Sequence, residues 1–244
     1  MFYLTRVKLG GNMSTISKGD IVNLNYTGRT KEDNKVVDTT IESIAKKENI
    51  YDEKVIYRPF TLIVGKNWLP VGLEEALIGM KEGEKKTIEI DAKNGFGLRD
   101  RSKIRLIQRR EFQRHQIKPK EDMKVEIGGQ TGRILKVSSS RVKVDFNHDL
   151  AGMDLIYDVE IIKKIIDIKE QFICLLEKRL PGVDFSSTKI NIKNKIIEVE
   201  LPKDTRFMEY IQFIRNGVSR DLGEITNKFD RITFIEHYDI EKKK

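Results

Sequence analysis

The sequence predicts an α+β protein whose first domain is a bent antiparallel sheet wrapped around one short helix. Its 244 residues exceed the length of an average domain. Short stretches of alternating apolar and polar residues recur over the first two thirds of the chain, whereas helical spacing dominates the last third. We therefore expect three units, with a small β-rich domain inserted into the first and a C-terminal α/β domain after it.

The composition is that of a soluble globular protein, with 39% hydrophobic and 34% charged residues. No run approaches eighteen apolar residues, and nothing follows the order of a secretory signal. The single cysteine, Cys174, cannot form an intrachain disulfide, and its apolar neighbours predict a buried position. A cytoplasmic location is the expectation.

The first twelve residues, MFYLTRVKLGGN, suit no helix or strand. The two glycine codons before Met13 read GGN-GGN and can spell a purine-rich ribosome-binding site. We therefore expect residues 1–13 to be an extension that precedes the true start of translation at Met13.

The elements of the first domain follow from Ser14 onward. Alternating Val22, Leu24 and Tyr26 predict a half-buried strand that ends at Gly28. Further extended segments are expected at VVDTT, PFTLIVG, KKTIEI and LIYDVEII, with a short helix and loop between residues 41 and 58. In VGLEEALIGM, apolar residues at helical spacing lie between two glycines and predict the single amphipathic helix.

The segment 98–145 reads as an inserted β meander, with strand signals RLIQRREF, MKVEI, GRILKV and RVKVDF. Between Leu98 and Lys143 there are fourteen Lys or Arg and five Asp or Glu, so this segment has a net charge of +9. The whole chain has a net charge of +8, so the rest of the chain is nearly neutral. Such a basic patch suits nucleic acid, but it equally suits acidic protein segments. Residues 168–244 then predict the order helix, hairpin, helix, strand, and contain no motif that indicates chemistry.

A set of motifs in fixed order resembles the FKBP-type peptidyl-prolyl cis-trans isomerases. The motifs are YTG, VVDTT, PFTLIVG, LPVGLEEALIGMKEGEK, NGFG, NHDLAG and LIYDVEII, which together cover about residues 14–167. The insertion between NGFG and NHDLAG and the extra C-terminal domain resemble the SlyD-like branch and its long archaeal members. The resemblance implies an FKBP-like isomerase domain at 14–97 and 146–167, an insert-in-flap chaperone domain at 98–145, and no cofactor. We expect no metal site, because His115, His148 and His237 lie far apart in the sequence and the His-rich and Cys-rich tail of some SlyD-like relatives is missing.

Such an isomerase needs neither a nucleophile nor a base. The Xaa-Pro bond rotates over a barrier of about 20 kcal/mol, because the amide loses resonance as it twists. Since the twisted amide is less polar than the planar one, an apolar and water-poor pocket favours it.

The resemblance assigns the pocket residue by residue. Leu73 would be the floor, Tyr26, Phe60 and Tyr157 the walls, and Asp38 a polar contact to the prolyl amide. Leu69 and Pro70 would lie along the peptide and offer it their backbone groups. The full predicted set is Tyr26, Asp38, Phe60, Leu69, Pro70, Leu73, Phe96, Leu150 and Tyr157 as pocket residues, with Val37, Asn147, His148 and Ala151 as substrate contacts at the rim.

Plainer interpretations exist for several of these residues. The three aromatic walls lie on strand faces that any sheet would bury, and Asp38 could cap the turn after it. His148 and Asp149 could form a catalytic pair, but no nucleophile accompanies them in the motif order. Two positions depart from the family: Leu73 replaces a tryptophan found in many relatives, and Phe96 replaces a tyrosine whose hydroxyl can bond a substrate carbonyl.

The two additional domains suggest further roles. In SlyD-like relatives the insert binds unfolded chains, so we expect residues near Phe112 and Ile117 to stay exposed for extended clients. The partners would be unfolded or nascent polypeptides containing Xaa-Pro, and not membranes or nucleic acid. The C-terminal domain would support a homodimer or bind clients as a second site. The alternatives are a holdase chaperone without catalysis, or an RNA- or ribosome-associated factor that uses the basic insert.

Overall fold

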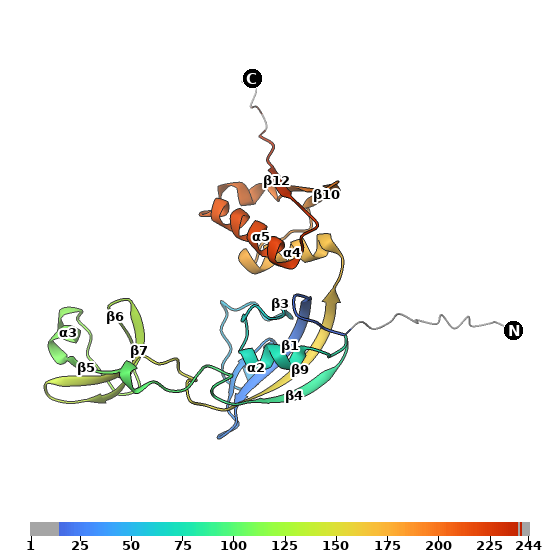
Figure 1. The fold of residues 1–244 in the computed structure, drawn as a ribbon. Helices are drawn as coiled ribbons and strands as arrows, with labels where there is room; N and C mark the ends of the chain where they lie inside the picture. Colours follow the sequence, from blue (N-terminus) through green and yellow to red (C-terminus); the bar gives the residue numbers. More distant parts are fainter. Residues whose placement is uncertain (1–14, 239, 241–244) are drawn as a thin grey trace.

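The computed structural model describes residues 15–238 and 240, and it contains three separate sheets (Figure 1). The expectation about residues 1–13 lies outside these residues. The central sheet lies between the insert, which projects to one side, and the C-terminal domain. No helix among the described residues has the length and apolarity needed to cross a membrane.

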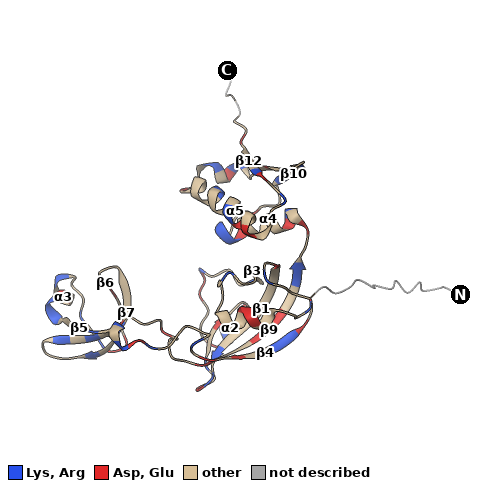
Figure 2. Ribbon diagram, viewed as in Figure 1, with Lys and Arg blue, Asp and Glu red and all other residues tan. Residues whose placement is uncertain are grey.

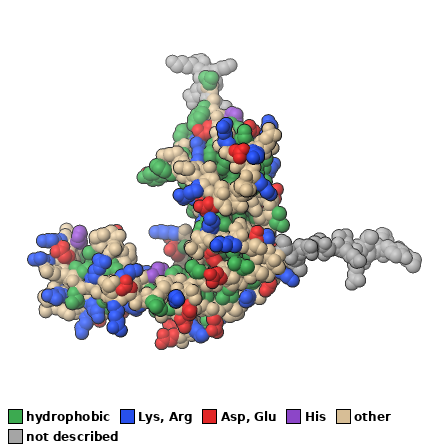
Figure 3. Space-filling view, viewed as in Figure 1, with side chains coloured by type: hydrophobic (Ala, Val, Ile, Leu, Met, Phe, Trp, Pro, Cys, Tyr) green, Lys and Arg blue, Asp and Glu red, His purple; other side chains and the backbone are tan. Residues whose placement is uncertain are grey.

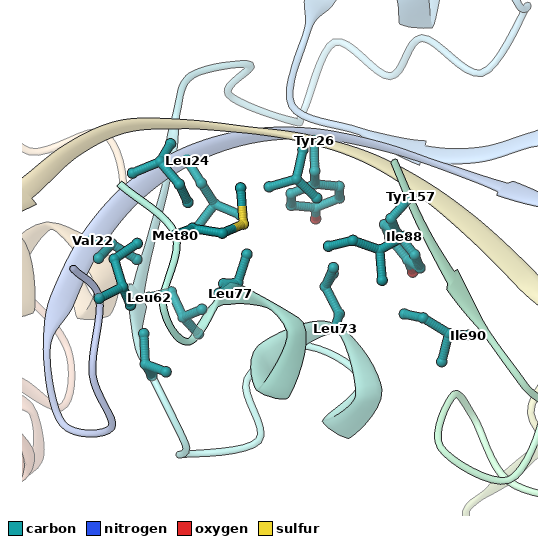
Figure 4. Close-up of a cluster of buried hydrophobic side chains, with 14 of the residues drawn as sticks. Val22, Leu24, Tyr26, Leu62, Leu73, Leu77, Met80, Ile88, Ile90 and Tyr157 are labelled. Atoms are coloured by element: carbon teal, nitrogen blue, oxygen red, sulfur yellow. The ribbon is translucent and has the colours of Figure 1, made fainter. Parts of the chain in front are cut away.

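The central sheet is antiparallel throughout and has the strand order β2-β1-β9-β4, with β3 also paired to β1. Its elements are β1 (Ile21–Thr30), β2 (Val36–Thr39), α1 (Glu42–Lys47), β3 (Phe60–Ile63), α2 (Val71–Leu77), β4 (Lys85–Ile90) and β9 (Leu155–Ile165). The predicted alternation on β1 is confirmed, since Val22, Leu24 and Tyr26 are all buried and face α2 (Figure 4). The sheet therefore curves around this helix and encloses the first core.

Gly28 does not end β1 as the sequence suggested. It lies inside the strand, opposite Asp38 on one side and Tyr157 on the other. A Cβ atom at this position would lie 2.6 Å from Cε1 of Tyr157. The glycine is thus required because the Tyr157 ring packs directly on the backbone of β1.

The other face of the central sheet carries a second apolar row. Ile21 pairs with Ile63 on one side and with Ile165 on the other, so the three side chains lie next to each other across three strands. All three are buried, and they belong to one core cluster with Phe172 and Leu175 of the C-terminal domain. The C-terminal domain is therefore packed onto the sheet and shares a hydrophobic core with it.

The C-terminal domain has the expected order of helix, hairpin, helix and strand. Its elements are α4 (Ile168–Arg179), β10 (Lys189–Lys193), β11 (Ile196–Glu200), η2 (Lys203–Phe207), α5 (Ile211–Ile225) and β12 (Arg231–Ile235). Asp167 caps α4 by accepting hydrogen bonds from the backbone N–H groups of Lys169 and Glu170. Cys174 is buried in this domain as expected, and burial raises the pKa of its thiol to about 11.

The insert forms a four-stranded antiparallel sheet in the order β5-β8-β7-β6. Its elements are η1 (Arg101–Lys103), β5 (Ile104–Gln108), α3 (Arg109–Arg114), β6 (Lys124–Ile127), β7 (Gln130–Val137) and β8 (Arg141–Asp145). The prediction of a strand through RREF was wrong, because these residues form α3. A sheet this small must cover one face, and α3 does so by placing Phe112 on it.

Candidate active site

An aromatic cluster lies where β1, β3 and β9 face helix α2. The rings of Tyr26 and Phe60 meet edge to face with centroids 6.1 Å apart, and Tyr26 and Tyr157 are 5.9 Å apart. Leu73, fully buried on α2, lies beneath the two tyrosines (Figure 4). The predicted walls and floor thus come together in one core cluster, against which Leu69, Phe96 and Leu150 pack from its edge.

The cluster contains one fixed polar contact. The Tyr26 hydroxyl donates a hydrogen bond of 2.8 Å to the Asp38 carboxylate, and burial together with this carboxylate raises the pKa of Tyr26. Within residues 15–238 and 240, Asp38 accepts no hydrogen bond from the turn that follows it, whereas Thr39 Oγ1 accepts one from the N–H of Ile41. Thr39, and not Asp38, therefore caps the turn, and the Asp38 carboxylate is oriented by Tyr26.

The Tyr157 hydroxyl makes no hydrogen bond to any residue in the part of the chain that the structure covers. Burial raises its pKa, with a smaller contribution from Asp38, so the group stays protonated and able to donate. The cluster therefore has two hydroxyl groups with different roles. The Tyr26 hydroxyl is hydrogen-bonded to Asp38, whereas the Tyr157 hydroxyl is free to donate a hydrogen bond.

The loop before α2 is held by Glu74, a residue that the sequence analysis missed. Its buried carboxylate accepts hydrogen bonds from the backbone N–H groups of Gly65, Asn67 and Leu69, at 2.7, 3.1 and 2.8 Å. A carboxylate directly after the buried Leu73, in the first turn of a helix, was the available signal for this role.

The expectation that Leu69 and Pro70 offer their backbone groups to a peptide is wrong for most of those groups. The N–H of Leu69 is bonded to Glu74, and proline has no N–H. The carbonyl of Pro70 accepts from the N–H groups of Leu73 and Glu74. These two residues can therefore contact a peptide mainly through their side chains.

His148 and Asp149 point to different partners and form no catalytic pair. The imidazole of His148 stacks on Phe96, with centroids 4.3 Å apart and an angle of 1°, and its Nδ1 accepts from the N–H of Leu150. Asp149 instead bonds Arg133 and Lys124 of the insert, which lowers the pKa of its carboxyl to about 2. His148 is thus a support for Phe96.

A groove of about 1160 Å³ borders the site between the β1–β2 turn and the segment after the insert. It brings together two predicted substrate contacts, Val37 and His148, and the predicted pocket residue Leu150 with Arg133 of the insert. Ala151 is buried beside it, and the Asn147 side chain bonds Asp145 and the backbone of Asp100. Asn147 therefore shapes the junction with the insert.

The predicted client contacts on the insert need correction. Phe112 is only 1% exposed and forms the centre of the insert core, and Ile117 packs partly buried against the same core. Their placement follows from the small size of the insert, which needs its largest apolar side chains for its own stability. The large apolar side chains that are exposed within residues 98–145 are Leu98, Leu106 and Met123.

Comparisons with known proteins agree with this architecture. The model of the FKBP26 IF domain matches residues 105–150, and that of the FKBP26 C-terminal domain matches residues 158–239. A short-type peptidyl-prolyl cis-trans isomerase from Methanocaldococcus jannaschii is 40% identical over 149 residues, which are 61% of this chain and 94% of that protein.

Bacterial relatives agree as well. A probable FKBP-type 16 kDa isomerase from Pseudomonas fluorescens is 36% identical over 43% of this chain and 71% of its own length. SlyD of Haemophilus influenzae is 27% identical over 54% of this chain and 70% of its own length. Given the ordered motifs, the aromatic cluster under a bent sheet and these relatives, the chain belongs to the FKBP-type peptidyl-prolyl cis-trans isomerase family.

Proposed function

We propose that the protein catalyses cis-trans isomerisation of Xaa-Pro bonds in polypeptides, with the aromatic cluster as its prolyl pocket. The observation that carries this proposal is the meeting of Tyr26, Phe60 and Tyr157 over Leu73, in a chain of this enzyme family. An apolar cup of this kind lowers the barrier by taking up the less polar, twisted amide. No covalent intermediate and no proton transfer are needed.

Asp38 has the role of orienting the peptide at the mouth of this pocket. Its carboxylate is exposed and held by the Tyr26 hydroxyl, so it can meet the polar groups around the proline without entering the apolar cup. The polar atoms of a bound peptide that lie outside the cup would interact with Asp38, and a polar atom that enters the cup would interact with the free hydroxyl of Tyr157.

Exchange NMR on a short Ala-Pro peptide tests the activity and its site. The wild-type protein should accelerate exchange, and Asp38→Ala should lower kcat/KM by about tenfold, which corresponds to roughly 1.4 kcal/mol for a contact to a charged group. Glu53→Ala, at an exposed loop position, is the matched control and should leave the rate unchanged. No acceleration by the wild-type protein would leave a holdase chaperone as the function.

We also propose a chaperone role for the insert. Its surface is rich in Lys and Arg (Figures 2 and 3), and Leu106 and Met123 stay exposed among them, with Leu98 at the junction. Positive charge speeds encounter with acidic chains, and exposed apolar side chains give contact with unfolded segments. Holding a client next to the pocket raises its local concentration there.

Deleting residues 99–145, with a short linker in their place, separates the two activities. Turnover of a tetrapeptide should be preserved, because the aromatic cluster comes from the central sheet and α2. Catalysed refolding of a proline-limited protein should fall, because the client is no longer held. An equal loss in both assays would contradict this division of roles.

The C-terminal domain offers a surface for a second copy of the chain. Phe207, Tyr210 and Phe213 are exposed near the start of α5, with Phe207 84% exposed. Three large aromatic side chains in water favour association, and two-fold pairing would cover them. Sedimentation of the full chain should show a dimer that Phe213→Asp weakens; a wild-type monomer at micromolar concentration would exclude it.

A further inference from the structure

Lys178 of the C-terminal domain reaches the outer wall of the candidate pocket. Its Nζ atom lies 3.2 Å from the ring centroid of Trp68 and 4.9 Å from that of Phe60. Phe60 in turn contacts Tyr26 inside the aromatic cluster, and Trp68 directly precedes Leu69. A cation from one domain thus contacts a wall residue of the predicted prolyl site of another.

The cleft around Lys178 contains charged side chains that form ion pairs and others that do not. It has a volume of about 650 Å³ and lies between the loop before α2 and the helices α4 and α5. Arg179 is paired with Asp221, and Lys66 is paired with Glu224.

Two cations in this cleft remain without a carboxylate. Among the residues that the structure describes, neither Lys178 nor Arg220 has an acidic partner within ion-pair distance. Glu74 on α2, which acts electrostatically on Lys178, uses its carboxylate to accept hydrogen bonds from three backbone N–H groups. The cleft therefore has spare positive charge beside Trp68.

The electrostatic environment of Lys178 agrees with this geometry. The pKa of Lys178 is lowered to about 8, chiefly because the ammonium group is partly buried; Asp221 opposes this shift, Arg179 adds to it, and Glu74 opposes it weakly. An ammonium group that is partly dehydrated and has no carboxylate partner is stabilised when a carboxylate binds beside it.

We infer that Lys178 is a specificity-determining residue, which the C-terminal domain contributes to the rim of the prolyl pocket. It favours client segments that carry an acidic side chain within a few residues of the proline. Cation–π contact with Trp68 and Phe60 fixes the ammonium group in place without neutralising its charge. The C-terminal domain thereby takes part in substrate selection.

Two peptides that differ by one charge test this role, which rests on the proposed isomerase function. They carry Glu or Lys at the same position, two residues before or after the proline, and their exchange rates are measured by NMR at low salt. For the wild-type protein, kcat/KM should be about three- to fivefold higher with Glu, the range of a partly exposed ion pair.

The variants separate selection from simple domain docking. Lys178→Met keeps the apolar stem and should bring the Glu-to-Lys ratio close to one, whereas Lys178→Glu should invert it. Lys193→Glu, a charge change on the exposed end of β10, should leave the ratio as in the wild type. For the wild-type protein, the ratio should also fall as pH rises through about 8, because Lys178 loses its charge there.

The outcomes that overturn the inference differ from those that overturn the isomerase. Equal slowing of both peptides by Lys178→Met, or a wild-type ratio of one, would make Lys178 a docking contact only and overturn its role in selection. Turnover of neither peptide by the wild-type protein would overturn the proposed activity and this role with it.

Discussion

The insert and the C-terminal domain are attached to the central sheet in opposite ways. The insert has a core of its own, centred on Phe112, and meets the rest of the chain through polar contacts such as those of Asp149 with Arg133 and Lys124. The C-terminal domain shares one apolar core with the sheet through the isoleucine row and Phe172. Polar contacts exchange readily with water, whereas a shared core does not. We therefore expect the insert to move and unfold alone, and the C-terminal domain to unfold with the sheet.

The largest effect should come from removing one side chain of the shared core. Phe172→Ala, at a fully buried position, should lower the free energy of unfolding by about 3–5 kcal/mol. The only tryptophan, Trp68, packs against both large cores, so its fluorescence reports the sheet and the C-terminal domain together. Urea denaturation should show one transition, shifted to lower urea.

Phe112→Ala is the matched comparison, because it deletes the same atoms from the core of the insert. It should lower protection of insert amides in hydrogen exchange and leave the Trp68 transition unchanged. If this variant shifted the Trp68 transition as far as Phe172→Ala does, the insert would not be an independent unit.

A smaller effect is expected where the insert joins the pocket. Phe96 precedes the insert and His148 follows it, and their stacked rings connect the two chain crossings at the edge of the aromatic cluster. Phe96→Tyr adds a hydroxyl that can bond a substrate carbonyl, so kcat/KM for a short peptide should rise about two- to tenfold, the value of one hydrogen bond. An unchanged or lower rate would show that this edge does not touch the substrate.

The strands and the residues of the aromatic cluster could be predicted from the sequence, whereas the contacts between domains could not. Alternation at Val22, Leu24 and Tyr26 was sufficient for β1, because burial on one face leaves a period of two. Phe112 was misplaced because RLIQRREF satisfies a strand pattern, and only the need to cover a small sheet makes its second half helical. Glu74 holds a loop that precedes its helix, and Lys178 contacts two aromatic rings that lie far from it in the sequence. Only tertiary packing brings these groups together, and local sequence patterns do not contain that information.

The smallest effect concerns the contacts of Asp149 with Arg133 and Lys124 of the insert. Asp149 is 40% exposed and bonded to Arg133 and Lys124, so its contribution to holding the insert should be about 0–1 kcal/mol. Because its pKa in the folded protein is lowered to about 2 from 3.8, the contacts are complete above about pH 4 and weaken as the pH falls toward 2. The distribution of distances between spin labels on the insert and on β4 should broaden over this range.

Asp149→Asn removes the charge without changing the shape of the side chain. It should give a broad distance distribution already at pH 7, with little further change in acid, whereas Glu126→Gln, at an exposed position of β6, should behave as the wild type does. A narrow distribution in the Asn variant would mean that the junction is held by other contacts, of which Asn147 with the backbone of Asp100 is the first to test. The insert would then be a fixed arm, and its clients would have to reach the pocket by their own flexibility.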